Sequence, residues 1–159
     1  MGLLKTILHC VKKTINRLMG NYPLSKYHFR VEWGGAQISF SEVGGLSMEI
    51  AVVEFREGSS PDQSAIKMPG LRKFTNIILK RGVKKADNDF FNWINSVRQN
   101  TVERRDIVIS LLNEAHEPVA VWKVHNAWPC KYEVGAFNAA SNDVLMETLE
   151  LAHEGFILT

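Results

Sequence analysis

The stretch Tyr27-His28-Phe29-Arg30-Val31-Glu32-Trp33-Gly34-Gly35 decides how this chain folds. Apolar and polar residues alternate along it, which is the period of a strand with one buried face. The two glycines that follow supply the positive φ angles of a tight hairpin turn, and residues 36–40 return as a second strand. We therefore predict an antiparallel hairpin here and a β-rich fold around it.

The rest of the body shows the same strand character on both sides of one helical segment. Further strands are predicted over residues 46–56, 74–81, 106–112, 119–132 and 143–154. Between the first two lies a long irregular stretch that opens at Gly58 and runs to Met68-Pro69-Gly70. The body is predicted to be mainly β, with an antiparallel barrel-like or sandwich-like sheet.

One helix is predicted within this body, over residues 87–99. Phe90, Trp93, Ile94 and Val97 recur at helical spacing and form its buried stripe, and Asp87 is placed to be the N-cap. The fold class is thus a β domain with one flanking α-helix.

The first 21 residues form a separate N-terminal extension ahead of a domain over residues 22–159. Their apolar residues recur every three to four positions, as on one face of an amphipathic helix: Leu4, Ile7, Leu8, Val11, Ile15 and Leu18. Basic residues fall on the opposite face. We expect this helix to dock by its apolar face in a protein groove, with contact to a membrane surface as the less favoured alternative.

The composition excludes several classes of protein. The chain has 159 residues, of which 45% are apolar and 23% charged, as in an ordinary globular domain. Two cysteines, Cys10 and Cys130, are too few for a disulfide scaffold, and we expect free thiols. No nucleophile elbow, phosphate-binding loop or metal-ligand spacing occurs. We therefore expect no enzyme activity, no cofactor and no metal.

One basic cluster leaves a nucleic-acid-binding domain open as a function of another class. It comprises Lys80, Arg81, Lys84, Lys85, Arg104 and Arg105. Binding of phosphates needs such charge, but the net charge of the whole chain is only +2. We favour a solvated rim with local salt bridges and predict no specific nucleic acid partner.

The predicted strands also raise the question of unprotected sheet edges. A strand such as 106–112 carries neither proline nor an inward charge to block pairing with another chain. If each copy offers one edge and accepts another, the contact repeats head to tail and produces a ring or a filament.

Blocks along the chain carry a resemblance to a known family. They are Tyr22–Leu24, Tyr27–Trp33, Phe40–Leu46, Glu54–Gly58, Lys67–Gly70, Leu79–Gly82, Phe91–Asn95, Arg104–Leu111, Asn126–Pro129 and Glu147–Gly155. From about Tyr22 to the C-terminus the sequence resembles the tail tube protein family of contractile phages and phage-tail-like contractile injection systems.

The resemblance implies a structural protein with the fold of the haemolysin-coregulated protein of type VI secretion. Six copies would close into a ring, and rings would stack into a tube that carries cargo through a target envelope. Sheath and baseplate proteins would be its partners, and assembly would take place in the bacterial cytoplasm as part of a phage tail or injection particle. A tube initiator that contacts the baseplate is the alternative within the family.

The resemblance also implies a contact loop that reaches the adjacent ring. Its residues would be Glu57, Gly58, Pro61, Asp62, Lys67, Pro69, Gly70 and Arg72. Glycines and prolines would set the shape of the loop, and the charged side chains would pair across rings. An ordinary surface loop is the alternative.

Overall fold

The computed structural model of the protein describes residues 24–59, 64–98 and 101–159, so the predicted N-terminal helix lies outside the described residues. The elements are β1 (Phe29–Trp33), β2 (Ala36–Ile38), β3 (Glu42–Gly44), β4 (Met48–Phe55), β5 (Ile66–Phe74), β6 (Ile77–Gly82), α2 (Asp89–Ser96), β7 (Arg105–Leu112), β8 (Pro118–Val134), β9 (Met146–Ala152) and β10 (Gly155–Leu158). The prediction of a mainly β body with one helix is confirmed for this part of the chain.

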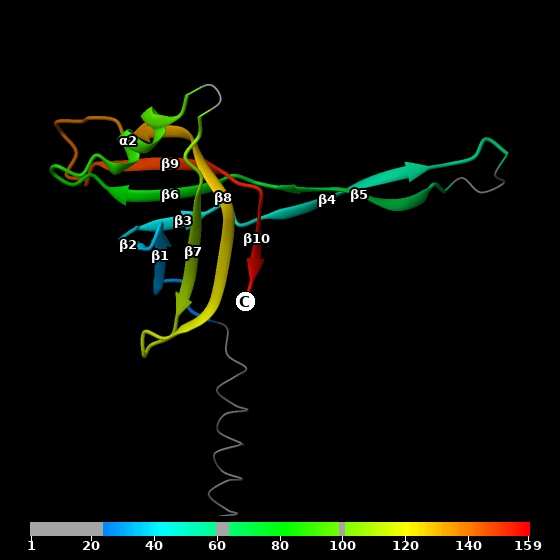
Figure 1. The fold of residues 1–159 in the computed structure, drawn as a ribbon, viewed down its shortest axis with the longest axis horizontal. Coiled ribbons are helices and arrows are strands. Elements are labelled where there is room, and N and C mark those ends of the chain that lie inside the picture. The colour runs from blue at the N-terminus through cyan, green and yellow to red at the C-terminus, as the bar shows by residue number, and fades with distance from the viewer. Residues whose placement is uncertain (1–23, 60–63, 99–100) are drawn as a thin grey trace, which may run out of the picture.

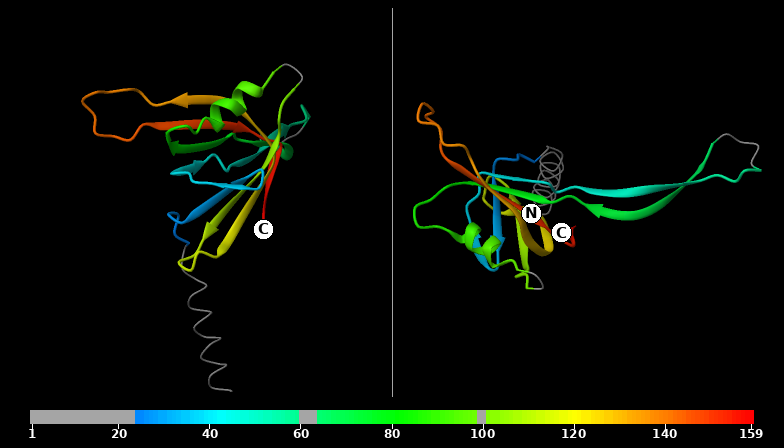
Figure 2. Two further views of the ribbon diagram at one scale, coloured as in Figure 1. Left: turned by 60° about the vertical axis from the view of Figure 1, so that its left-hand side comes forward. Right: turned by 90° about the horizontal axis from the view of Figure 1, so that it is seen from above.

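Eight strands form one bent antiparallel sheet in the order β2-β1-β7-β8-β9-β6-β3, with β10 paired to β8. The first half of β8 pairs with β7 and β10, and its second half pairs with β9. The sheet therefore changes direction along β8, and its two parts diverge from there (Figures 1 and 2). The ends of the path, β2 and β3, do not pair with each other.

The bend in β8 has a local cause in its sequence. Asn126 has a φ of 53°, a left-handed conformation that asparagine tolerates better than most residues. Three residues later the pairing with β9 shifts between Pro129 and Lys131. Proline lacks an N–H to donate to the sheet, so it fits at such an irregularity. These two irregularities turn the strand from one part of the sheet into the other.

The hydrophobic core lies between the two parts of the sheet and under α2. It contains buried residues from β1, β6, β7, β8, β9 and α2, among them Val31, Trp33, Leu79, Ile107 and Leu149. The predicted hairpin is confirmed, because Val31 pairs with Ile38 and the turn glycines have φ angles of 57° and 86°.

The helix is shorter than predicted and begins differently. Helix α2 spans Asp89–Ser96, Asn88 is its N-cap residue, and the side chain of Asn88 makes no capping hydrogen bond. Asp87 was predicted as the cap; its Oδ1 accepts a hydrogen bond from the backbone N–H of Asp89 at 3.3 Å, and its carboxylate also accepts two hydrogen bonds from Arg81. Phe90 and Trp93 are buried as predicted, packing on Trp33 with ring centroids 5.5 and 4.5 Å away.

The long excursion after β4 is a β-hairpin, so the prediction of an irregular stretch running to Gly70 is wrong. Strands β4 and β5 pair with each other and with no other strand, and they project from the body as an arm (Figure 1). Pro69 and Gly70, interpreted as loop residues, lie inside β5. A two-stranded ribbon accepts a proline because both strands are edges.

Residues 106–112, which lack features that block edge pairing, do not form an edge of the sheet. Strand β7 lies between β1 and β8 and is hydrogen-bonded on both sides. The apolar residues Ile107 and Ile109 of β7 are buried in the core. The open edges belong to other strands.

Gly45 joins β3 to the arm where no side chain fits. Its φ is 86°, and an added Cβ would lie 2.0 Å from the carbonyl oxygen of Asn76. We expect Gly45→Ala to lower the free energy of unfolding by about 2 kcal/mol, measured by urea unfolding. Gly44→Ala is the matched control, because nothing lies within 4 Å of its Cβ position. Equal losses in both variants would contradict this assignment.

Candidate assembly surfaces

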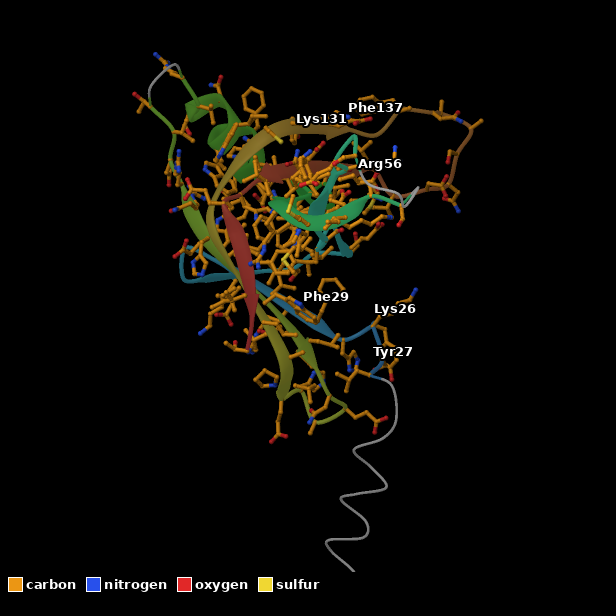
Figure 3. The ribbon with its side chains drawn as sticks, turned by 90° about the vertical axis from the view of Figure 1, so that its right-hand side faces the viewer. Lys26, Tyr27, Phe29, Arg56, Lys131 and Phe137 are labelled. Atoms are coloured by element: carbon orange, nitrogen blue, oxygen red, sulfur yellow. The ribbon has the colours of Figure 1, made fainter. Side chains whose placement is uncertain are left out.

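Strands β3, β6, β9 and the second half of β8 form a four-stranded wall with two different faces. The core face carries Ile77, Leu79, Leu149 and Leu151, all fully buried. The opposite face carries alternate residues of the same strands: Ile78, Lys80, Lys131, Glu133, Thr148 and Glu150. Figure 3 shows Lys131 on β8 and Phe137 on the loop that follows. The core face of the wall is therefore mainly apolar, with Arg81 and Glu147 buried at one end, and the other face is charged.

On this charged face of the wall, the charged side chains pair with neighbours in the same chain. Lys80 Nζ lies 3.0 Å from Glu42 Oε2 on the neighbouring strand, and Lys131 Nζ lies 2.8 Å from Glu133 Oε2. Exposed pairs of this kind contribute little to stability, so their effect is to leave a polar, nearly balanced surface. Such a face is suited to water.

The wall has an unpaired edge at each end. Strand β3 pairs only with β6, and residues 128–134 of β8 pair only with β9 within the described part of the chain. The two edges differ in sequence and lie on opposite sides of the wall. Two copies can therefore extend each other's sheets head to tail, with β3 of one copy beside β8 of the next.

Both faces of the arm carry exposed apolar residues interspersed with charged ones. Residues directly opposite in an antiparallel pair share a face. Met48, Ile50 and Val52 lie on one face with Pro69 and Phe74.

Val53 and Phe55 lie on the other face with Met68 and Ile66. Val52 is 62% exposed and Val53 48% exposed, and within residues 24–59, 64–98 and 101–159 no layer covers either face. Two-stranded hairpins in water are marginal, so burial against other chains would stabilise this one.

A β-bulge in the middle of the arm exposes one further apolar side chain, that of Leu71, to solvent. Gly70 and Leu71 of β5 stand opposite the single residue Ala51, between the pairs Ile50–Arg72 and Val52–Pro69. An added Cβ on Gly70 would lie 2.9 Å from the carbonyl oxygen of Ala51, so glycine allows the strands to approach. Leu71 is 81% exposed as a result.

The structure distributes the predicted contact-loop residues over the arm. Glu57 and Gly58 are exposed near its tip, whereas Pro61 and Asp62 lie outside the described residues. Lys67, Pro69, Gly70 and Arg72 are brought together on β5. Lys67 Nζ lies 3.5 Å from Glu54 Oε1 across the hairpin, so this charge has a partner within its own chain.

The predicted contact loop consists of charged residues, glycines and prolines and does not include the apolar surface of the arm. The adjacent apolar residues Val52 and Val53 could have predicted this surface. Consecutive residues of a strand point to opposite faces, so apolar residues in succession indicate a strand that is covered on both faces.

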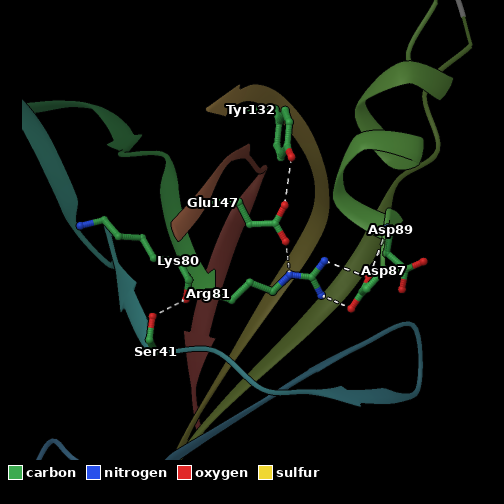
Figure 4. Close-up of polar contacts among 7 residues, drawn as sticks. All are labelled: Ser41, Lys80, Arg81, Asp87, Asp89, Tyr132 and Glu147. Carbon is green, nitrogen blue, oxygen red and sulfur yellow. Dashed lines mark hydrogen bonds and ion pairs between the residues drawn. The ribbon is translucent and has the colours of Figure 1, made fainter. Parts of the chain in front are cut away.

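A buried ionic cluster holds the wall to α2 (Figure 4). Arg81 is 3% exposed; its Nε donates to Glu147 Oε1 at 2.6 Å, and its two terminal nitrogens donate to Asp87 at 2.9 and 3.0 Å. The hydroxyl of Tyr132 donates to Glu147 Oε2 at 3.0 Å. Every oxygen of both carboxylates therefore has a donor.

The cluster shifts the pKa values of Asp87 and Tyr132. Burial by itself would raise the pKa of Asp87, but the hydrogen bonds from Arg81 outweigh it and hold this pKa below its ordinary value. Burial raises the pKa of Tyr132, and the hydrogen bond to Glu147 raises it further, so the phenol stays protonated and donates. The cluster is suited to fixing geometry, and its guanidinium also lies 4.0 Å above the ring of Phe90.

Four of the six residues in the predicted basic cluster have acidic partners in the same chain. Arg81 is buried with Glu147 and Asp87, and Lys80 pairs with Glu42. Arg104 pairs with Glu154, and Arg105 pairs with Glu103 while lying over the ring of Trp93. These contacts support the interpretation of the cluster as local salt bridges.

The described residues contain neither a metal-binding cluster nor a membrane-spanning helix. That part of the chain has no group of three or more His, Cys, Asp or Glu side chains placed to hold a metal ion. Nor does it contain a helix with the length and hydropathy to cross a membrane. Cys130 is a free thiol whose pKa is raised by burial and by the charge of Glu150.

Comparisons with known proteins fit the geometry of the wall and the arm. Residues 25–157 match the family model of the T4-like virus tail tube protein gp19. None of the curated protein sequences compared with the chain matches it significantly.

Solved structures extend the comparison. A chain of the sheath–tube complex of the extracellular contractile injection system PVC, in its extended state, is 36% identical, with a TM-score of 0.83 over 91% of this chain and 96% of that one. A chain of the tube-terminating cap of the anti-feeding prophage is 35% identical, with a TM-score of 0.81 over 87% and 92%.

Hcp1 from Flavobacterium johnsoniae shares the fold at 16% identity and a TM-score of 0.51, over 82% of this chain and 93% of its own. The family match covers most of the chain, and the resemblance predicted from the sequence is confirmed. The chain belongs to the T4-like virus tail tube protein family.

Proposed function

We propose that this protein is the inner tube subunit of a contractile injection system or phage tail, in which six copies close into a ring and rings stack around a central channel. The observation that carries the proposal is the wall with two unlike, unpaired edges. Head-to-tail pairing of β3 with the second half of β8 in the next copy satisfies both edges and repeats around a closed circle.

The orientation of the wall follows from its two faces. The charged face needs water, so it lines the channel, while the apolar face and α2 lie toward the outside of the ring. The arm leaves the body where β4 and β5 depart, and the apolar residues on both of its faces are buried between copies in the same ring or the adjacent one. The protein acts as structural wall and not as an enzyme.

The partners of the tube are proposed from the assembly in which a relative was solved. The PVC relative is part of a sheath–tube complex, and we infer sheath and baseplate proteins as partners and a cargo as the occupant of the channel. Assembly takes place in the bacterial cytoplasm, and the tube becomes part of the particle.

Size and shape of the purified protein test the proposal. We expect light scattering after gel filtration to show a particle of six times the chain mass of 18.0 kDa, and negative-stain electron microscopy to show annular particles or tubes. Glu133→Gln, on the charged face, should assemble like the wild type. A protein that stays monomeric at high concentration would contradict the proposal. Single rings that co-purify with baseplate in place of tubes would identify a tube initiator.

A further inference from the structure

An apolar groove lies at the seam of the open sheet. It has a volume of about 610 Å³ and runs between β1 and β3, which lie in different parts of the sheet and do not pair with each other. Its apolar lining consists of Phe29, Val43, Leu46, Ile109, Leu111 and Trp122. Four of these, Phe29, Val43, Leu46 and Trp122, pack on the core with one side and remain only partly buried. The groove is therefore an opening into the hydrophobic interior.

The groove begins where the described chain begins. Lys26 and Tyr27 line it, and the described residues start at Leu24 (Figure 3). Tyr27 is exposed and marks the entrance, and Phe29 lies further along β1 on the same lining. Any segment that precedes Leu24 thus leaves the body at the mouth of the groove.

The segment that precedes Leu24 has the chemistry that such a groove binds. Its six apolar residues from Leu4 to Leu18 share one helical face, and a helix over residues 4–18 would be about 22 Å long. Residues 19–23 span at most about 17 Å when extended, enough to reverse direction and too little to reach far from the mouth. The segment has a net charge of +4, and the remainder of the chain has a net charge of −2.

We propose that residues 4–18 form a helix that folds back on its own chain and fills this groove with its apolar face. The helix closes the seam between β1 and β3 and covers the exposed lining. The family model matches residues 25–157, so this helix lies ahead of the part of the chain that the model covers. Its basic face points to solvent at the surface of the subunit.

Site-directed disulfide formation in the full-length chain tests the position of the helix. In a Cys10→Ser, Cys130→Ser background, Leu8→Cys with Leu46→Cys should form an intrachain disulfide, detected by electrophoresis without reductant and by mass spectrometry. Lys12→Cys with Leu46→Cys is the matched control from the basic face and should form at least tenfold less. Only interchain disulfides, or none, would overturn the proposal; the first result would place the helix in a neighbour's groove.

Hydrogen exchange on full-length variants keeps the test independent of cysteine chemistry. Val11→Asp should increase exchange at least tenfold in residues 4–18 and also in β3, whereas Lys12→Asp should change neither. Unaltered exchange in β3 in the Val11→Asp protein would contradict the proposal. So would binding of the wild-type segment to anionic lipid vesicles with β3 left unprotected. The intrachain disulfide forms within one copy and is a readout separate from ring formation, so a monomeric protein that forms it would reject the tube and retain the docked helix.

Discussion

A Val52→Asp variant is expected to fold and to form no tubes. Val52 is 62% exposed in the single chain, so the change costs the isolated subunit little. In the proposed assembly the same side chain is buried against another copy. Loss of its apolar burial costs about 2 kcal/mol, a factor of roughly 30 in each contact, and burial of an unpaired carboxylate adds to this cost. Because every copy in the ring carries the defect, assembly should fail.

Gel filtration with light scattering and negative-stain electron microscopy measure this effect. Val53→Asp places the same charge on the opposite face of the arm and should also prevent tubes, which tests whether both faces are covered. Val52→Ile is the matched control, because it keeps the β-branched apolar side chain, and it should assemble normally. Circular dichroism and thermal unfolding establish that each variant is folded. Abundant tubes of Val52→Asp would show that this face of the arm is solvent-exposed in the assembly.

Arg81→Ala is expected to lower the free energy of unfolding by about 3–5 kcal/mol, a large part of the stability of a domain this size. The substitution leaves the carboxylate of Glu147 only 3% exposed and without its guanidinium partner. It also removes the contact above Phe90 and both hydrogen bonds to Asp87. The cost arises because an unpaired buried charge is far less stable than a paired one.

Denaturant unfolding measures the loss, and a double variant separates its causes. Arg81→Met with Glu147→Leu removes both charges and fills the space with apolar atoms, so it should recover most of the stability. Lys80→Ala changes the neighbouring lysine, which is in a more exposed pair, and should cost less than about 1 kcal/mol. If the double variant is as unstable as Arg81→Ala, the loss comes from packing and not from the buried charge.

Acid should weaken the same cluster. The pKa of Asp87 is lower in the folded protein than its ordinary value of 3.8, so its contribution is complete above about pH 4. This contribution is lost as the pH falls through the folded pKa and Asp87 becomes protonated.

Local patterns in the sequence predicted much of the fold. The alternation in Tyr27–Trp33 and the paired glycines after it specified a strand and its turn, because both depend on neighbours in the chain. The stripe of Phe90 and Trp93 likewise predicted the only helix of the described body. The blocks shared with tail tube proteins predicted the family.

Errors arose where an assignment depended on distant residues. Residues 106–112 carry the pattern of a strand, but only the sheet shows that β7 is central and hydrogen-bonded on both sides. Asp87 has the sequence position of a helix cap and accepts from the N–H of Asp89, but only the tertiary structure shows that its carboxylate also pairs with Arg81. The stretch around Pro69 and Gly70 resembled a loop, and pairing with β4 made it a strand.

The amino-acid sequence alone determined which segments are extended, where the tight turn lies and which family the protein belongs to. Only the tertiary structure decided which strands are edges, that β8 bends between two parts of the sheet, and that Arg81 meets a carboxylate 66 positions away. The physical reason is the range of the interactions. Side-chain alternation and turn conformation act over a few residues, whereas strand pairing and buried ion pairs depend on how distant segments pack.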